Sequence, residues 1–224
     1  MLEVQTINKS YKKKSVLENI SLTIERGEIV GLVGENGAGK STLLHILSTL
    51  LRPDAGEIYW NGLSYRQHYQ EIKQKIGFVP QDLAIWEHFS VEDNMRYFEQ
   101  LSWKNIGIEA CKKICEEMQL VQWKEPVSSL SGGMKRKLNL AISLIHQPEL
   151  LLLDEPTVGI DMRSKQEIGR FLQLLAKTQG TTIIYTSHDM SEIEQFTDRV
   201  LLIGKDYYYQ NLLSARGIHV DCLS

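Results

Sequence analysis

Short apolar runs alternate with amphipathic stretches along most of the chain. β-Branched and aromatic residues in short runs predict strands, whereas apolar residues at helical spacing predict helices. The runs expected to form strands are 2–7, 16–24, 28–33, 57–60, 76–79, 150–153, 181–186 and 200–203. The run 150–153 is continuously apolar, which is typical of a strand buried on both faces.

Helical spacing is found over 40–50, 109–120, 134–145 and 168–175, and Ser90 with Asp93 predicts an N-cap before a further helix. The first strands are joined by short turns and are expected to be antiparallel, whereas the later strands alternate with helices. The pattern predicts an α/β fold with a mostly parallel core sheet, an antiparallel β front and a helical subdomain. We expect one domain over 1–224, with its core lobe at about 1–81 and 148–224 and its helical subdomain at about 82–147.

Residues Gly34 to Ser41 fit the phosphate-binding loop pattern, in which two glycines five positions apart are followed by Lys and Ser. Glycines let backbone N–H groups turn inward around an anion. Lys40 can reach the β- and γ-phosphates, and the Ser41 hydroxyl can bind Mg²⁺. A strand precedes this loop and a helix follows it, so the triphosphate is expected at a helix N-terminus. The chain is therefore predicted to bind a nucleoside triphosphate, in preference to an ordinary glycine turn.

The composition narrows the choice of partners and compartment. The net charge of −3 gives no electrostatic indication of a nucleic-acid partner, so none is expected. Three cysteines without metal-ligand spacing indicate reduced thiols in the cytoplasm. The N-terminus lacks the basic and apolar regions of a signal peptide, and no apolar stretch is long enough to span a bilayer.

Two further motifs carry chemistry. Asp154 and Glu155 end the apolar run 150–153, where a carboxylate can hold Mg²⁺ and a second one can polarise the attacking water. Ser131, Gly132 and Gly133 open an amphipathic helix and predict a second anion site, formed by a Ser cap and bare N–H groups at the positive end of the helix dipole. Two anion sites in one chain suggest that a second copy supplies half of each site.

In these motifs the chain resembles the ATPase subunits of ATP-binding cassette (ABC) transporters, over about residues 2–203. Gly34–Ser41 is similar to the Walker A motif, 150–155 to Walker B, and 130–134 to the signature motif. The resemblance places Gln81 in the Q-loop, His188 at the switch histidine that contacts the γ-phosphate, and 158–161 in the D-loop. It implies the cofactors ATP and Mg²⁺ and the P-loop NTPase fold.

The resemblance, together with the motifs, gives the expected site. The residues expected to hold the nucleotide are Tyr11, Gly34, Glu35, Asn36, Gly37, Ala38, Gly39, Lys40, Ser41, Thr42, Ser131, Gly132 and Gly133. The residues expected to act in catalysis are Glu155, His188, Lys40 and Gln81. The residues expected to hold the metal are Ser41, Gln81 and Asp154. Tyr11 would stack on the adenine, although a Tyr at a strand end is commonly a packing residue.

The signature motif ends in Met134 where many family members have Gln. Together with 155–161, it resembles the exporter branch that handles antibiotics, drugs, lipids or ions with separate ATPase and membrane chains. The resemblance implies an ATP-hydrolysing motor subunit, peripheral on the cytoplasmic face of the membrane, that pairs with a second ATPase subunit and a transmembrane permease. The alternatives are a non-transport cassette acting on nucleic acid or ribosomes, and a subunit that uses ATP only for assembly.

Overall fold

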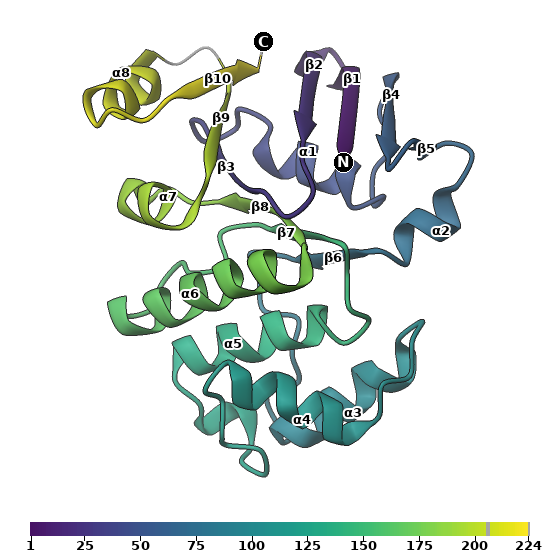
Figure 1. Cartoon of the computed structure of the whole chain (residues 1–224), viewed down its shortest axis with the longest axis vertical. Helices are drawn as coiled ribbons and strands as arrows, with labels where there is room; N and C mark the ends of the chain where they lie inside the picture. The colour runs from purple at the N-terminus through teal and green to yellow at the C-terminus, as the bar shows by residue number, and fades with distance from the viewer. Residues whose placement is uncertain (205–206, 224) are drawn as a thin grey trace.

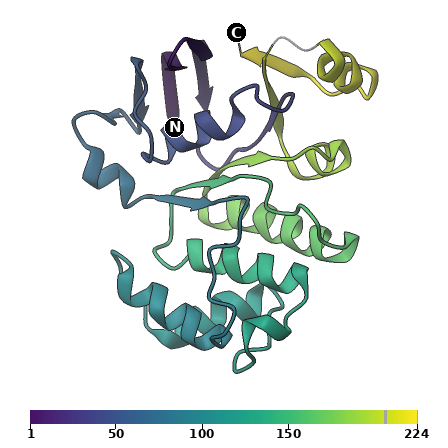
Figure 2. The ribbon, with the colours of Figure 1, turned by 180° about the vertical axis from the view of Figure 1, so that it is seen from behind.

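A computed structural model describes residues 1–204 and 207–223 (Figure 1). The core lobe was expected to continue to residue 224, and residues 205, 206 and 224 lie outside the described part. Two β-sheets lie in one half of the molecule, and several helices fill the other half, as the reverse view also shows (Figure 2).

The smaller sheet is antiparallel, as the short turns between its strands predict. Its strand order is β2-β1-β4-β5. The bounds are β1 (Leu2–Tyr11), β2 (Lys14–Ile24), β4 (Ala55–Trp60) and β5 (Leu63–Ser64). This sheet is the expected β front, and it holds β2 close to the loop that follows the first central strand.

The larger sheet is parallel in every strand pair, in the order β10-β9-β3-β8-β7-β6. The bounds are β3 (Ile29–Val33), β6 (Ile76–Val79), β7 (Leu150–Leu153), β8 (Thr182–Thr186), β9 (Arg199–Ile203) and β10 (Val220–Leu223). Because parallel strands end at one edge, the loops after β3, β6, β7 and β8 meet there. These four loops carry the predicted nucleotide chemistry.

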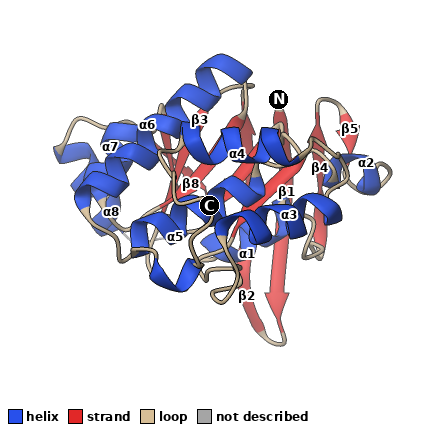
Figure 3. Ribbon diagram, turned by 90° about the horizontal axis from the view of Figure 1, so that it is seen from below, coloured by secondary structure: helices blue, strands red, loops and turns tan. Residues whose placement is uncertain are grey.

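The helices connect these strands and cover the sheet. Their bounds are α1 (Lys40–Leu47), α2 (Tyr69–Lys73), α3 (Val91–Leu101), α4 (Ile108–Glu117), the 3₁₀ turn η1 (Val127–Ser129), α5 (Gly132–Ser143), α6 (Met162–Gln179), α7 (Met190–Phe196) and α8 (Tyr207–Ala215). Seen from below, helices α3, α4 and α5 lie in front of the strands (Figure 3). Ser90 and Asp93 form a capping box that fixes the start of α3, as the sequence predicts.

Two hydrophobic cores lie on opposite faces of the parallel sheet. Leu150 and Leu152 pack with the antiparallel sheet and α1, whereas Leu151 and Leu153 pack with α5, α6 and the helices below them. Side chains of a strand alternate between its faces, so the continuous apolar run of β7 fills both cores. The buried strand that the sequence predicts is thereby confirmed.

Several bounds and elements differ from the sequence prediction. Helix α1 ends at Leu47 rather than at 50, because Ser48 caps it and Thr49 takes the left-handed φ of 66°. The helical subdomain was expected from about residue 82, and its first helix, α3, begins at Val91, directly after the predicted N-cap Ser90. The short elements α2, β5, α7, α8 and β10 were not expected.

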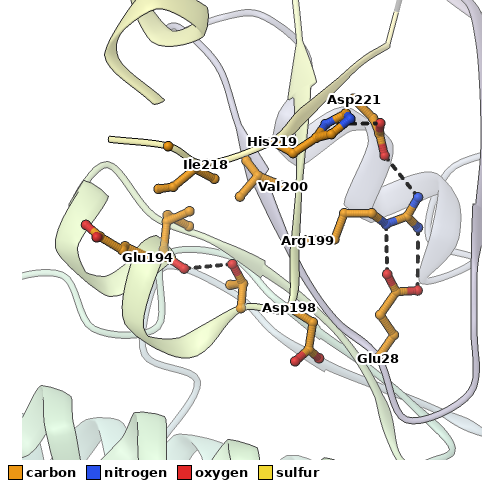
Figure 4. Close-up of a pocket in the computed structure, with 11 residues that line it drawn as sticks. Glu28, Glu194, Asp198, Arg199, Val200, Ile218, His219 and Asp221 are labelled. Carbon is orange, nitrogen blue, oxygen red and sulfur yellow. Dashed lines mark hydrogen bonds and ion pairs between the residues drawn. The ribbon is translucent and has the colours of Figure 1, made fainter. Parts of the chain in front are cut away.

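The edge strand β10 is tied to the rest of the sheet through Arg199. Its guanidinium lies 2.7 Å from a carboxylate oxygen of Glu28 and 3.1 Å from one of Asp221 (Figure 4). The cavity of about 580 Å³ beside these residues lies between β9, β10 and α7. A single side chain therefore connects the start of β3 with β10.

Among residues 1–204 and 207–223, no helix has both the length and the apolar content needed to cross a bilayer.

Candidate nucleotide site

The phosphate-binding loop connects β3 to α1. Gly37 and Gly39 take φ values of 83° and 108°, a region that side chains with a Cβ rarely adopt. A Cβ on Gly39 would also lie only 2.7 Å from the Leu17 side chain on β2. Helix α1 starts directly at Lys40, and among the described residues no side chain caps its first N–H groups. Those groups are therefore free to bind an anion at the helix N-terminus.

Lys40 is buried within this loop, and its ammonium group donates to the carbonyl oxygens of Gly34 at 2.7 Å and Glu35 at 3.1 Å. Burial lowers the pKa of Lys40, and the nearby carboxylates of Glu155 and Asp154 act in the opposite direction. The lysine that the sequence predicts for the phosphates thus lies beside both predicted acidic residues.

Asp154 and Glu155 follow the carboxyl end of β7, where the sequence predicts them. Asp154 is buried, and Thr186 at the end of β8 donates its hydroxyl to the Asp154 carboxylate at 3.0 Å. The same hydroxyl accepts the backbone N–H of Glu155 at 2.8 Å. Thr186 was not among the predicted site residues. In the sequence it is recognisable only as a β-branched residue of a predicted strand.

The side chains of Gln81, Glu155 and His188 meet although they come from three different loops. His188 Nε2 lies 2.7 Å from one oxygen of the Glu155 carboxylate, and Gln81 Nε2 donates to the other at 3.1 Å. Glu155 takes the left-handed φ of 48°, a conformation that costs about 1–3 kcal/mol outside glycine. Such strain persists only where the surroundings hold the residue in place.

The signature segment begins α5, and Ser131 caps it by accepting the N–H of Met134 at 3.3 Å. Ser131 and Gly132 are exposed, whereas Gly133 packs against α6. A Cβ on Gly133 would lie 2.1 Å from the Ser164 hydroxyl, so no larger residue fits between the two helices. This packing role of Gly133 adds to the predicted anion contact.

Arg136 was not predicted as a site residue, yet it joins two of the predicted loops. From α5, its guanidinium donates to the backbone carbonyl of Gln81 and, at 3.4 Å, to that of Val158. In the sequence it stands between Lys135 and Lys137, and no signal distinguishes it from them.

The remaining predicted residues occupy the edges of the site. Glu35, Asn36 and Ser41 are exposed, while Ala38 and Thr42 are partly buried. Tyr11 ends β1, and its ring is 48% exposed with the Lys9 ammonium 5.8 Å from the ring centre. Its stacking on adenine stays a prediction.

Comparison with known families decides the kind of protein. The family model described as "ABC transporter" matches residues 17–158, which include the phosphate-binding loop, the signature segment and Asp154. The chain belongs to the ABC transporter family. A second model, described as an AAA domain of a putative AbiEii toxin of a type IV TA system, matches residues 123–194.

Curated relatives of this ABC ATPase are ATP-binding proteins. The linearmycin resistance ATP-binding protein LnrL of Bacillus subtilis is 40% identical, over 92% of this chain and 67% of the relative. The lantibiotic transport ATP-binding protein SrtF of Streptococcus pyogenes is 35% identical, over 92% and 91%. The daunorubicin resistance ATP-binding protein DrrA3 of Streptomyces coeruleorubidus is 35% identical, over 90% and 65%. The chain thus spans about two thirds of the length of LnrL and DrrA3.

Solved structures agree with this assignment. A dimeric bacterial ABC transporter cassette has a TM-score of 0.81 at 24% identity, covering 91% of this chain and 94% of that chain, and it shows a shared fold. A dimeric cassette in a post-hydrolysis state with ADP and Pi has a TM-score of 0.78 at 26% identity, with the same coverage. The predicted P-loop NTPase fold, the family and the ATPase activity are confirmed, and ATP is the nucleotide.

Proposed function

We propose that this ABC ATPase is the motor subunit of an exporter for antibiotics or lantibiotic-like peptides, and that it works with a separate transmembrane subunit. The main support for the proposal is that both Gln81 and His188 contact the Glu155 carboxylate beside the phosphate-binding loop. A subunit that uses ATP only for assembly does not need a carboxylate placed for general base catalysis. The relatives named for antibiotic resistance and lantibiotic transport support the choice of cargo.

ATP would lie with its phosphates on the loop from Gly34 to Thr42 and its adenine against Tyr11. The donor set suits Mg²⁺, which prefers hard oxygen ligands: the Ser41 hydroxyl, the Gln81 amide oxygen and the buried Asp154 carboxylate. The bound ion would neutralise charge on the β- and γ-phosphates. Thr186 supports the site by holding Asp154 in orientation.

Glu155 would take a proton from the attacking water as a general base. Its carboxylate lies 2.7 Å from His188 Nε2, so the imidazole and the base share one location near the γ-phosphate. Lys40 would stabilise charge on the same phosphate group. Gln81 contacts Glu155 directly and would carry the state of the site to the loop that faces the membrane partner.

The exposed N-terminus of α5, with Ser131 and Gly132, is available to a second cassette. We propose that two copies, or this chain and a related one, close head-to-tail so that each ATP lies between Walker A of one chain and Ser131 to Gly133 of the other. Closure and reopening would then drive the membrane subunit between conformations.

An exposed aromatic cluster follows the Q-loop and suits the transmembrane partner. Trp86, Phe89 and Tyr97 are each more than 40% exposed, and Trp86 stacks on Phe89 with ring centres 5.9 Å apart. Aromatic side chains of this kind are enriched at protein interfaces. We place the cluster in a helical subdomain of about 82–147, set against the core lobe, and the whole subunit on the cytoplasmic face of the membrane.

The alternative of a cassette acting on nucleic acid or ribosomes has no support from the relatives named above. The net charge of −3 does not favour a polyanion, and the relatives named above are transport or resistance proteins.

The test is the Glu155→Gln variant, which keeps the size of the side chain and removes the base. With ATP and Mg²⁺, it should elute as a stable dimer in size-exclusion chromatography and hydrolyse ATP at least a hundredfold more slowly than the wild type. The control is the same protein without nucleotide, which should elute as the wild type does. A monomeric variant with wild-type turnover would refute the assigned roles.

Cargo and partner need a second experiment. The tagged wild-type protein should co-purify from its own membranes with a polytopic membrane protein when ATP is present. Nucleic acid or ribosomes in place of a membrane protein would support the alternative.

A further inference from the structure

A buried carboxylate lies behind the catalytic loops. Glu192 on α7 is only 4% exposed, and its Oε2 accepts hydrogen bonds from the hydroxyls of Tyr185 (2.5 Å), Thr157 (2.6 Å) and Ser187 (3.0 Å). Its other oxygen forms an ion pair with Lys165 Nζ at 2.7 Å. Glu192 is not part of any motif that binds the nucleotide.

Two of these partners belong to the loops that carry the catalytic groups. Thr157 stands two residues after Glu155, and Ser187 stands directly before His188. Glu192 therefore contacts the Walker B loop and the switch loop at the same time. The two loops are linked through a single atom, because one carboxylate oxygen of Glu192 accepts hydrogen bonds from the hydroxyls of both Thr157 and Ser187.

Lys165 extends the cluster to α6 and to the residue after His188. Its ammonium also lies 3.0 Å from Asp189. Burial lowers the pKa of Lys165, but the hydrogen bonds and charges of Glu192 and Asp189 outweigh it and raise the pKa overall. The lysine is thus held in its charged form between two carboxylates.

A buried charge is expensive, and packing alone does not require one. A carboxylate removed from water costs several kcal/mol unless it is paired and hydrogen-bonded, and apolar replacements of buried ion pairs are often neutral or stabilising, by about 1–4 kcal/mol. Tyr185 and Thr157 already lie 3.0 Å apart and could bond to each other without a carboxylate. The charge of Glu192 thus suggests a role beyond packing.

A cavity adjoins Glu155, His188 and the cluster around Glu192. A cavity of about 290 Å³ is lined by Glu155, His188, Thr157, Lys165 and Glu192, among others. Both loops adjoin this cavity, so on this side the hydrogen bonds to Glu192 are the contacts that connect them. The left-handed backbone of Glu155 would relax if its surroundings released it.

We infer that Glu192 is a positioning residue for ATP hydrolysis. Through Thr157 and Ser187 it sets the distance between the Glu155 carboxylate and the His188 imidazole, and it keeps Glu155 in its strained conformation. The inference rests on the proposed roles of Glu155 and His188. It assigns the cluster of Glu192, Lys165, Tyr185, Thr157 and Ser187 to catalysis rather than to stability alone.

The experiment compares steady-state ATP hydrolysis by the full chain and by Glu192→Gln, with Glu194→Gln as the matched control. Glu194 lies on the same helix, and its half-exposed side chain forms a surface ion pair with Arg216 at 3.3 Å. A displacement of about 1 Å can cost about a hundredfold in rate, so Glu192→Gln should lower kcat about ten- to a hundredfold. The KM for ATP should change less than about twofold in both variants, and Glu194→Gln should keep wild-type kcat.

A second set of variants separates positioning from folding. Thr157→Val should lower kcat several-fold alone, but less than about twofold when added to Glu192→Gln, because the two side chains act through one contact. If Glu192→Gln does not fold, Thr157→Val and Ser187→Ala carry the test, with the same loss in kcat at constant KM.

Three results would overturn the inference: unchanged kcat in Glu192→Gln, a loss confined to KM, or a loss that follows the fraction of unfolded protein. Each can occur while Glu155→Gln is inactive, in which case the proposed function stands without the role of Glu192. If Glu155→Gln hydrolyses ATP as the wild type does, the proposed function fails and the inference fails with it.

Discussion

Gly169 of α6 offers a quantitative test of the packing between α6 and α7. A Cβ at this position would lie 2.3 Å from a ring carbon of Phe196 and within 2.5 Å of two more, against an ordinary contact of 3.4 Å or more. Phe196 is 3% exposed, so its ring has little free space to move into. The Gly169→Ala variant must therefore shift the ring or the helix by about 1 Å.

The net effect is a balance of two terms. Overpacking costs about 1–3 kcal/mol, and the severity of this overlap places the cost at the upper end, near ~3 kcal/mol. Alanine gains about 1 kcal/mol over glycine inside a helix. We expect Gly169→Ala to be destabilised by about 2 kcal/mol, which lowers the Tm of a chain this size by about 4–8 °C.

The assay is thermal and urea unfolding of wild type, Gly169→Ala, Phe196→Leu and the double variant. The smaller leucine removes the overlapping ring atoms, so adding Phe196→Leu to Gly169→Ala should cost less than Phe196→Leu alone, or restore stability. Equal or higher stability of Gly169→Ala would refute the reasoning, because helix propensity would then outweigh a contact that is looser than described. Additive effects in the double variant would refute it as well.

Two further predictions concern buried polar and ionisable groups. Burial raises the pKa of Cys111 to about 11 and that of Cys115 to about 12, so both thiols stay protonated at pH 8. Ellman's reagent should therefore react with the exposed Cys222 at once and with the two buried cysteines only after unfolding. Immediate reaction of all three thiols would contradict this burial. Lys137→Met removes a buried ammonium that lies 2.6 Å from Glu167 and should cost about 1–3 kcal/mol. The cost is lower than for a carboxylate left wholly unpaired, because Arg163 still contacts Glu167 at 2.8 Å. The half-exposed control Lys112→Met should cost less than about 0.5 kcal/mol. Lys137, and to a smaller extent Arg163, lower the pKa of Glu167. The stabilisation is therefore complete above the ordinary pKa of Glu and is lost as pH falls through the lowered pKa. If the free energy of unfolding of Lys137→Met fell as steeply with pH in acid as that of the wild type, this reasoning would be wrong.

The sequence predicts five of the six strands of the parallel sheet, all except β10, because each of the five is an apolar run with clear borders. Ile76–Val79 and Leu150–Leu153 match their predicted bounds, and the loops after them carry residues with distinctive chemistry. The short helices α2 and α7 were not predicted, since five to seven residues do not complete a periodic pattern. The pairing of β10 with β9 depends on contacts that local patterns do not contain.

The candidate site likewise contains residues that the sequence predicts and residues that only the structure reveals. Lys40, Asp154, Glu155 and the glycines stand in motifs whose order along the chain has a chemical reason, and the structure brings Glu155 to His188 and Gln81 as those motifs require. Arg136 and Glu192 act through backbone carbonyls and buried hydroxyls that no motif records. A buried carboxylate and an exposed one look alike in a sequence, so their roles depend on the three-dimensional arrangement.

The hydrogen bonds from Arg136 to two backbone carbonyls couple two segments of the site. One guanidinium holds the segment at Gln81, which would follow the membrane partner, and the segment at Val158, which would face the second cassette. A rotation of α5 cannot then displace one segment without pulling on the other. In the proposed head-to-tail pair, a movement of the segment at Gln81 would thus be passed on to the segment at Val158, which would face the second cassette.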